Sequence, residues 1–209
     1  MTTVLAVAEH RRGELREVSY QLVSAGRSLA ATTGGDLHVA IPGGDMDAFT
    51  EAMQRDGVSV IHRLPAGEEF NHDVYTQGVG GLVEDLEADF LVLPHSVNSL
   101  DYAPAVATDT DMTLVPDVIE FEVDGETLLA TREMYGSKVE TTIEIENRPV
   151  AVTIREGEWP SDEDLGDPEI RTVDFEPEAS AIGSTVLGYE EIAAGDVDVG
   201  DADFLIGVG

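Results

Sequence analysis

The side chains best placed to bind a ligand follow three predicted strands. They lie in the turns Glu9-His10, Pro42-Gly43-Gly44 and 94–99, the last of which reads PHSVNS. Open parallel sheets bind ligands outside the carboxyl ends of their strands, where glycine turns and helix N-termini offer N–H groups to anions. Ser96, Asn98 and Ser99 lead into a predicted helix, so they can either cap that helix or hold a phosphate. Capping is the favoured interpretation, because Ser and Asn are preferred N-cap residues.

The sequence contains no recognisable catalytic or metal-binding motif. It has no cysteine, and its histidines are too scattered to form an H-x-H or H-x-x-x-H pair. His95-Ser96 lacks the G-x-S-x-G turn that exposes a nucleophilic serine. Gly78-Val79-Gly80-Gly81 lies inside a predicted helix rather than between a strand and a helix, and the sole lysine, Lys138, is not part of a phosphate-binding loop. We therefore expect neither catalytic residues nor a metal site, and helix packing is the expected role of the glycines.

Acidic residues dominate the charge of the chain. The 209 residues include 43 Asp and Glu against 11 Lys and Arg, for a formal net charge of -32. Such a surface repels nucleic acid and anionic membranes. The almost complete loss of lysine indicates a halophilic protein adapted to molar salt, where the Debye length falls to about 3 Å. The first apolar run is too short for a signal peptide, and no run approaches the roughly 18 residues of a membrane span. We expect a soluble cytoplasmic protein without membrane insertion.

Strands and helices alternate over the first half of the chain. Apolar patterning predicts strands over Thr3–Ala8, Leu37–Ile41, Val58–Leu64 and Asp89–Leu93, and helices over Val18–Thr32, Met46–Arg55, Phe70–Leu86 and Leu100–Met112. This alternation is typical of a three-layer α/β fold with a doubly wound, mostly parallel, Rossmann-like sheet. Asp124-Gly125 then predicts a hairpin between Val118–Val123 and Thr127–Arg132. Together with strands over Val139–Glu146 and Pro149–Arg155, this hairpin is expected to form an antiparallel extension.

The composition changes beyond residue 157. Residues 158–201 are rich in acidic residues and contain three prolines, so we expect an acidic linker or extended arm after an α/β domain over residues 1–157. Two apolar islands in the arm, Ile170–Phe175 and Ile182–Tyr189, are expected to form edge strands or to contact a partner. Residues 202–209 read as a buried strand running into a glycine turn, which suggests the truncated start of a further domain.

Several ordered motifs between Val4 and Gly157 resemble the α subunit of electron transfer flavoproteins. Val4–His10 followed by Gly13-Glu14-Leu15 looks like the family's first strand and glycine hairpin. Further similarities lie in the strand Ala88–Pro94, the Asp101-Tyr102-Ala103-Pro104 helix, Pro116-Asp117-Val118, Thr131–Lys138 and Arg148–Gly157. The chain departs from the family pattern at Ser99-Leu100, where Gly-Arg is usual, and at Glu133, which replaces a common proline.

The resemblance implies the scaffold and dimerisation half of an electron carrier. In that family an α and a β subunit form a heterodimer, FAD sits mainly in the second α domain, and electrons pass from flavoprotein dehydrogenases to a quinone reductase. The FAD-binding domain would begin near Asp203, so the resemblance implies FAD in the complete protein and no FAD-binding residue in this chain. Thr131, Arg132, Tyr135 and Lys138 are the candidate contacts to the β subunit, and core strand packing is an equally good alternative for them.

A second interpretation is a stand-alone nucleotide-binding protein similar to universal stress domains. Such a protein needs a phosphate-holding glycine loop after the fourth strand. The turn at Pro94–Ser99 has no glycine, so the flavoprotein scaffold is favoured.

Overall fold

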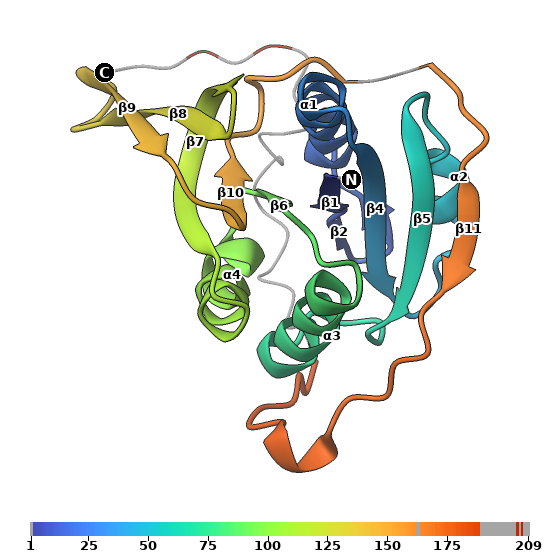
Figure 1. The fold of residues 1–209 in the computed structure, drawn as a ribbon. Helices are drawn as coiled ribbons and strands as arrows, with labels where there is room; N and C mark the ends of the chain where they lie inside the picture. Colours follow the sequence, from blue (N-terminus) through green and yellow to red (C-terminus); the bar gives the residue numbers. More distant parts are fainter. Residues whose placement is uncertain (1, 162–163, 189–203, 205, 207–209) are drawn as a thin grey trace.

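The computed structural model describes residues 2–161, 164–188, 204 and 206. Figure 1 shows one α/β sheet with helices on both sides. The strands are β1 (Thr3–Val7), β2 (His10–Arg11), β3 (Glu14–Leu15), β4 (Asp36–Gly43), β5 (Val58–Pro65), β6 (Phe90–Pro94), β7 (Thr113–Asp124), β8 (Thr127–Met134), β9 (Val139–Ile145), β10 (Val150–Ile154) and β11 (Glu169–Thr172). The helices are α1 (Val18–Thr33), α2 (Asp47–Ala52), α3 (His72–Asp85) and α4 (Val97–Asp109), followed by the 3-10 turn η1 (Ala179–Ala181).

The main sheet within the described residues has the order β11-β5-β4-β1-β6-β10-β7-β8-β9. Every pair from β11 to β7 is parallel, whereas β8 and β9 add antiparallel strands at one edge. The predicted doubly wound, mostly parallel α/β fold with an antiparallel extension is therefore confirmed.

The placement of β10 was predicted wrongly. The segment Pro149–Arg155 was expected in the antiparallel extension, but β10 lies parallel between β6 and β7, in the interior of the sheet (Figure 1). All five residues of β10 are buried. A strand that is apolar on consecutive positions can be covered on both faces, which an exposed edge strand cannot be.

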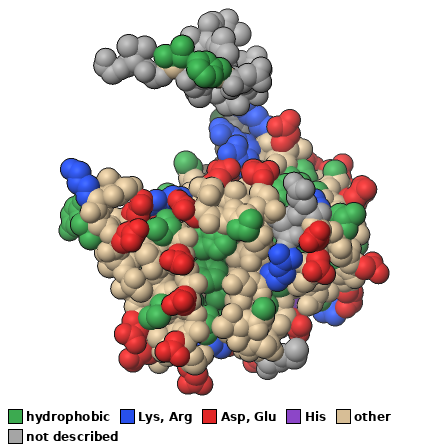
Figure 2. All heavy atoms as spheres, turned by 90° about the horizontal axis from the view of Figure 1, so that it is seen from above, with side chains coloured by type: hydrophobic (Ala, Val, Ile, Leu, Met, Phe, Trp, Pro, Cys, Tyr) green, Lys and Arg blue, Asp and Glu red, His purple; other side chains and the backbone are tan. Residues whose placement is uncertain are grey.

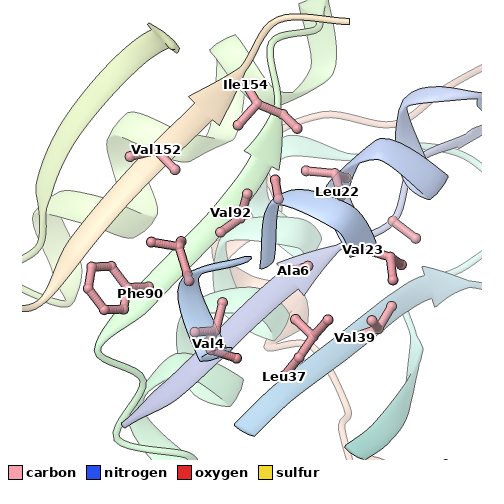
Figure 3. Close-up of a cluster of buried hydrophobic side chains, with 14 of the residues drawn as sticks. Val4, Ala6, Leu22, Val23, Leu37, Val39, Phe90, Val92, Val152 and Ile154 are labelled. Carbon is pink, nitrogen blue, oxygen red and sulfur yellow. The ribbon is translucent and has the colours of Figure 1, made fainter. Parts of the chain in front are cut away.

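Two apolar layers hold the helices against the sheet. α1 and α2 pack on one face through Leu22, Leu29 and Met53, each almost fully buried, and Figure 3 shows Leu22 and Val23 among the side chains of the central strands. α3 and α4 cover the other face through Val79 and Val106. Each fully buried aliphatic side chain contributes about 1.5–3 kcal/mol of transfer free energy, so the helices dock firmly without any disulfide.

Local signals explain where the helices begin and end. Asn71 caps α3, since its side-chain oxygen accepts hydrogen bonds from the N–H groups of Asp73 and Val74. Gly34 ends α1 in the left-handed conformation with φ 65°. α4 begins at Val97, three residues earlier than predicted, because Ser96 is its N-cap. α2 is shorter than the predicted helix over Met46–Arg55.

The acidic arm lies along the domain in the described part of the chain. β11 pairs with β5 at the sheet edge, as expected for the island containing Ile170. Val173, Phe175 and Ile182 then pack against the layer under α3. Ile182 was expected in an edge strand or against a partner, and it contacts the domain's own core instead. Val186 and Leu187 remain exposed, and Tyr189 lies outside the described residues. Of the predicted segment 202–209, only Phe204 and Ile206 are described, and both are exposed.

Candidate functional site

A cleft of about 590 Å³ opens at the carboxyl ends of β1 and β6. The chain runs from β1 to β4 and β5 on one side of β1 and then crosses through α3 to β6 on the other side. The winding therefore reverses between β1 and β6, which is where open α/β sheets bind ligands. The walls come from the β2–β3 hairpin, the loop before α3, the first turn of α4 and Val186 of the arm.

Glu9 projects into this cleft from the end of β1. Its backbone is held by α1, because Ser19 Oγ accepts from the Glu9 N–H and donates to the Glu9 carbonyl, each at 3.0 Å. The Arg16 N–H also donates to that carbonyl at 2.9 Å. Burial raises the pKa of the Glu9 carboxyl, and the Ser96 hydrogen bond and Arg16 oppose that shift. The structure thus fixes one partly buried carboxylate at the switch point, the place between β1 and β6 where the winding of the sheet reverses.

Two of the three candidate anion-binding residues line the cleft. Ser96 caps α4, where its hydroxyl accepts from the Ser99 N–H at 3.1 Å and donates to the Glu9 carboxylate. Asn98 lines the cleft from the first turn of the helix. Ser99 is 1% exposed and lies beneath the cleft rather than in it. Both Asn98 and Ser99 are helical, which corrects their expected position in the loop before the helix.

A cationic rim that the sequence analysis did not single out lies on the β2–β3 hairpin and at the residue that follows it. Arg11, Arg12 and Arg16 all line the cleft. Arg12 and Gly13 form the tight turn with φ 53° and 80°, the left-handed conformation that two-residue hairpins favour. His10 is fixed beside them, with Nε2 2.9 Å from the Pro42 carbonyl oxygen and its ring stacked on Phe49. The sequence did offer a signal for this rim, because three of the chain's ten arginines fall within residues 11–16.

The sheet and its antiparallel extension are joined next to the cleft by an ion cluster. Arg155 donates two hydrogen bonds to Asp117, at 2.9 and 2.8 Å, and a third to Glu133 at 2.5 Å. Arg155 lowers the pKa of Asp117, and Ser137 and Arg155 lower that of Glu133. His95 adjoins this cluster, with its Nδ1 2.8 Å from Thr153 Oγ1 and its Nε2 3.8 Å from Asp117 Oδ1. This cluster positions the hairpin β8–β9 relative to β10.

A second titratable pair lies away from the cleft, on β4 and β5. His38 Nδ1 and His62 Nε2 are 2.9 Å apart, and the two rings are nearly parallel. Burial lowers the pKa of both imidazoles, and that of His62 falls to about 4. The pair is therefore neutral near pH 7 and forms a hydrogen bond inside the sheet.

The residues that the structure describes contain neither a candidate metal site nor a candidate membrane-spanning helix. No cluster of three or more His, Asp or Glu side chains there could hold a metal ion. None of the described helices is long and apolar enough to cross a bilayer. Gly78 packs inside α3 as expected, since a Cβ at that position would lie 2.9 Å from the Leu64 side chain.

The comparisons with known proteins decide the family. The profile of the electron transfer flavoprotein domain matches residues 4–178, which include every strand of the nine-stranded sheet except the first residue of β1. The chain belongs to the electron transfer flavoprotein domain family.

The matched relatives are mostly α subunits of electron transfer flavoproteins. The α subunit from Methylophilus methylotrophus is 32% identical over 212 residues, covering 100% of this chain and 65% of the relative. That from Clostridium acetobutylicum is 27% identical over 99% of this chain and 64% of its own length. A protein named FixB from Clostridium saccharobutylicum is 29% identical over 74% of the chain. The chain spans just under two thirds of its first relatives' length.

Within this electron transfer flavoprotein domain, the four candidate interface residues lie on the β8–β9 hairpin at the sheet edge. Thr131 and Thr142 face each other across the two strands, with their hydroxyl oxygens 3.0 Å apart. Arg132 pairs with Val118 of β7 in the antiparallel register. Tyr135 is 76% exposed in the turn, and Lys138 is also exposed at its end. Strand pairing thus accounts for Thr131 and Arg132, whereas Tyr135 and Lys138 face outward.

Proposed function

We propose that this chain is the N-terminal scaffold and dimerisation domain of an electron transfer flavoprotein α subunit. The observation that carries the proposal is the family match over residues 4–178, together with α-subunit relatives that align along the whole chain. In this proposal the chain supports electron transfer from flavoprotein dehydrogenases to a quinone reductase and contributes no catalytic residue. It works in the cytoplasm, without nucleic acid and without insertion into a membrane.

The β subunit is the proposed partner, and the end of the β8–β9 hairpin is the proposed contact. Tyr135, Met134 and Val139 expose apolar surface there, next to Lys138. An exposed tyrosine in an apolar patch is typical of residues that anchor protein interfaces. β9 also leaves one side of the sheet unpaired within the described residues, so the hairpin offers backbone groups as well as side chains.

FAD belongs to the complete protein in this proposal and not to the 209 residues of this chain. The described cleft has no glycine turn at a helix N-terminus of the kind that holds a pyrophosphate. The chain purified alone is therefore expected to show no flavin absorbance. Stoichiometric bound flavin or AMP would instead favour the stand-alone nucleotide-binding alternative.

Association with the β subunit is the direct test. The chain is co-expressed with the cognate β subunit and analysed by size-exclusion chromatography in high salt, with Tyr135→Ala and Val97→Ala as matched variants. Val97 is 85% exposed but lies on α4 and not on the hairpin. The wild type and Val97→Ala are expected to co-elute with β, and Tyr135→Ala to bind at least about tenfold more weakly, as for an interface anchor. Failure of the wild type to co-elute would refute the scaffold proposal.

A further inference from the structure

The cleft at the switch point has the position and size of a ligand site. Its volume of about 590 Å³ falls within the range of small-molecule pockets. The N-terminus of α4 opens into it, and the first N–H groups of a helix have no acceptor inside the helix. In many open sheets a phosphate takes this position. What this chain places there is a carboxylate of its own.

The contact between Glu9 and Ser96 lies at the helix N-terminus. The Ser96 hydroxyl donates its single proton to Glu9 and accepts from the Ser99 N–H, so it offers no donor to a ligand. Leu100 N–H bonds to the Ser96 carbonyl. The Glu9 carboxylate thus lies against the first turn of α4, where it interacts favourably with the positive end of the helix dipole.

Glu9 is held in this position from several sides. Ser19 and Arg16 bind its backbone, as described above, and the side chain crosses from the end of β1 to α4. Tyr75 and Tyr102 pack edge to face behind it; burial raises the pKa of both hydroxyls, and the charge of Glu9 adds to that shift. Arg16 and Arg11 supply compensating positive charge. If the carboxylate moved aside, it would lose its hydrogen bond to Ser96.

We propose that Glu9 is a built-in anion that occupies the phosphate position of this cleft and excludes phosphate esters, nucleotides included, from it. A phosphate at the α4 N-terminus would lie against the fixed carboxylate, and like charges at close range in a partly buried site repel strongly. The arginine rim does not overcome this exclusion, because Glu69 and Glu156 line the same cleft and Glu156 pairs with Arg16. This inference is independent of binding to the β subunit.

The test compares AMP binding by the wild type with that of Glu9→Gln. The glutamine retains the size of the side chain and an acceptor for Ser96 but removes the charge. Glu68→Gln is the matched control, because it removes one carboxylate from the same cleft away from α4. Binding is followed by ¹⁵N–¹H NMR of the amides of Val97 and Asn98 at a salt concentration where all three proteins are folded.

The expected result is a gain of at least about tenfold in AMP affinity for Glu9→Gln, a difference of 1.4 kcal/mol. The shifts should centre on Val97 and Asn98, and Glu68→Gln should bind like the wild type. If Glu9 had only a structural role, replacing it with glutamine would not create a binding site for AMP. Wild-type affinity equal to that of a folded Glu9→Gln, or an equal gain in Glu68→Gln, would overturn the proposal. If Glu9→Gln fails to fold, Glu9→Ala takes its place, and submillimolar AMP binding by the wild type alone also overturns it.

Discussion

The His38–His62 pair makes stability depend on pH in a predictable direction. His62 is 4% exposed, and its Nε2 lies 2.9 Å from His38 Nδ1. Burial lowers the pKa of His62 to about 4, and the neighbouring His38 and Arg171 act in the same direction while Glu169 opposes them. The unfolded chain, whose histidines titrate near 6.5, therefore binds protons more tightly than the folded one. The contribution of His62 to the free energy of unfolding is fully present above about pH 6.5 and is lost as the pH falls toward 4.

The size of this effect follows from the same shift. A pKa lowered from 6.5 to about 4 corresponds to at most about 3.4 kcal/mol. β11 at the sheet edge is the only strand beyond β5 in the described part of the chain, so water can approach the pair and relax the shift. We expect about 1–2 kcal/mol to be lost between pH 7.5 and about pH 5 through this pair.

Urea unfolding in high salt at several pH values measures the loss. His62→Gln removes the titrating ring and keeps a partner for His38, while His72→Gln is a matched control at a half-exposed histidine that pairs with Asp101. The wild type and His72→Gln should lose about 1–2 kcal/mol more than His62→Gln between pH 7.5 and about pH 5. Comparing variants cancels the titration of the many carboxylates. Identical pH profiles for the wild type and His62→Gln would refute the reasoning.

Three further predictions concern stability. The melting temperature should rise steeply from about 0.1 to about 3 M KCl, because a net charge of -32 is self-repulsive in dilute buffer and acidic side chains are spread over the face seen in Figure 2; a flat profile in thermal melts would contradict this. Arg155→Met should lower the free energy of unfolding by about 1–3 kcal/mol and speed hydrogen exchange in β8, since Asp117 loses its charged donor; unchanged exchange would argue against a positioning role. Gly78→Ala should destabilise by about 1–3 kcal/mol through contact with Leu64 and Phe175, whereas Gly81→Ala in the same helix, with open space at its Cβ, should stabilise by about 0.5–1 kcal/mol in urea unfolding; equal effects would refute the packing argument.

Much of the fold was predictable because periodicity reports which faces of an element are buried. The consecutive apolar residues of Phe90–Pro94 are typical of a strand covered on both faces, and β6 does lie in the interior of the sheet. Val150–Ile154 carries the same signal, but its position late in the chain, after the hairpin, favoured an edge placement. Strand order depends on contacts between distant residues, such as Val152 with Val92 and Val115. Patterning within one segment does not contain that information.

The cleft was only partly predictable for the same reason. Its position after the first and fourth predicted strands follows from the general rule for parallel sheets. The pairing of Glu9 with Ser96 joins residues 87 positions apart, and that of Asp117 with Arg155 joins residues 38 apart. A serine before a helix suits either a cap or a phosphate site; the sequence favoured the cap, and the structure shows Ser96 capping α4 beside the Glu9 carboxylate.

The central position of β10 has a consequence for how the chain folds during synthesis. Until Val150–Ile154 leaves the ribosome, β6 lacks its neighbour on one side and β7 lacks its parallel partner. A nascent chain that ends before β10 therefore exposes two hydrophobic strand edges in the middle of the future sheet, where they are open to mispairing. The first 149 residues are thus expected to wait for the last interior strand, and the sheet should close as one cooperative step rather than strand by strand.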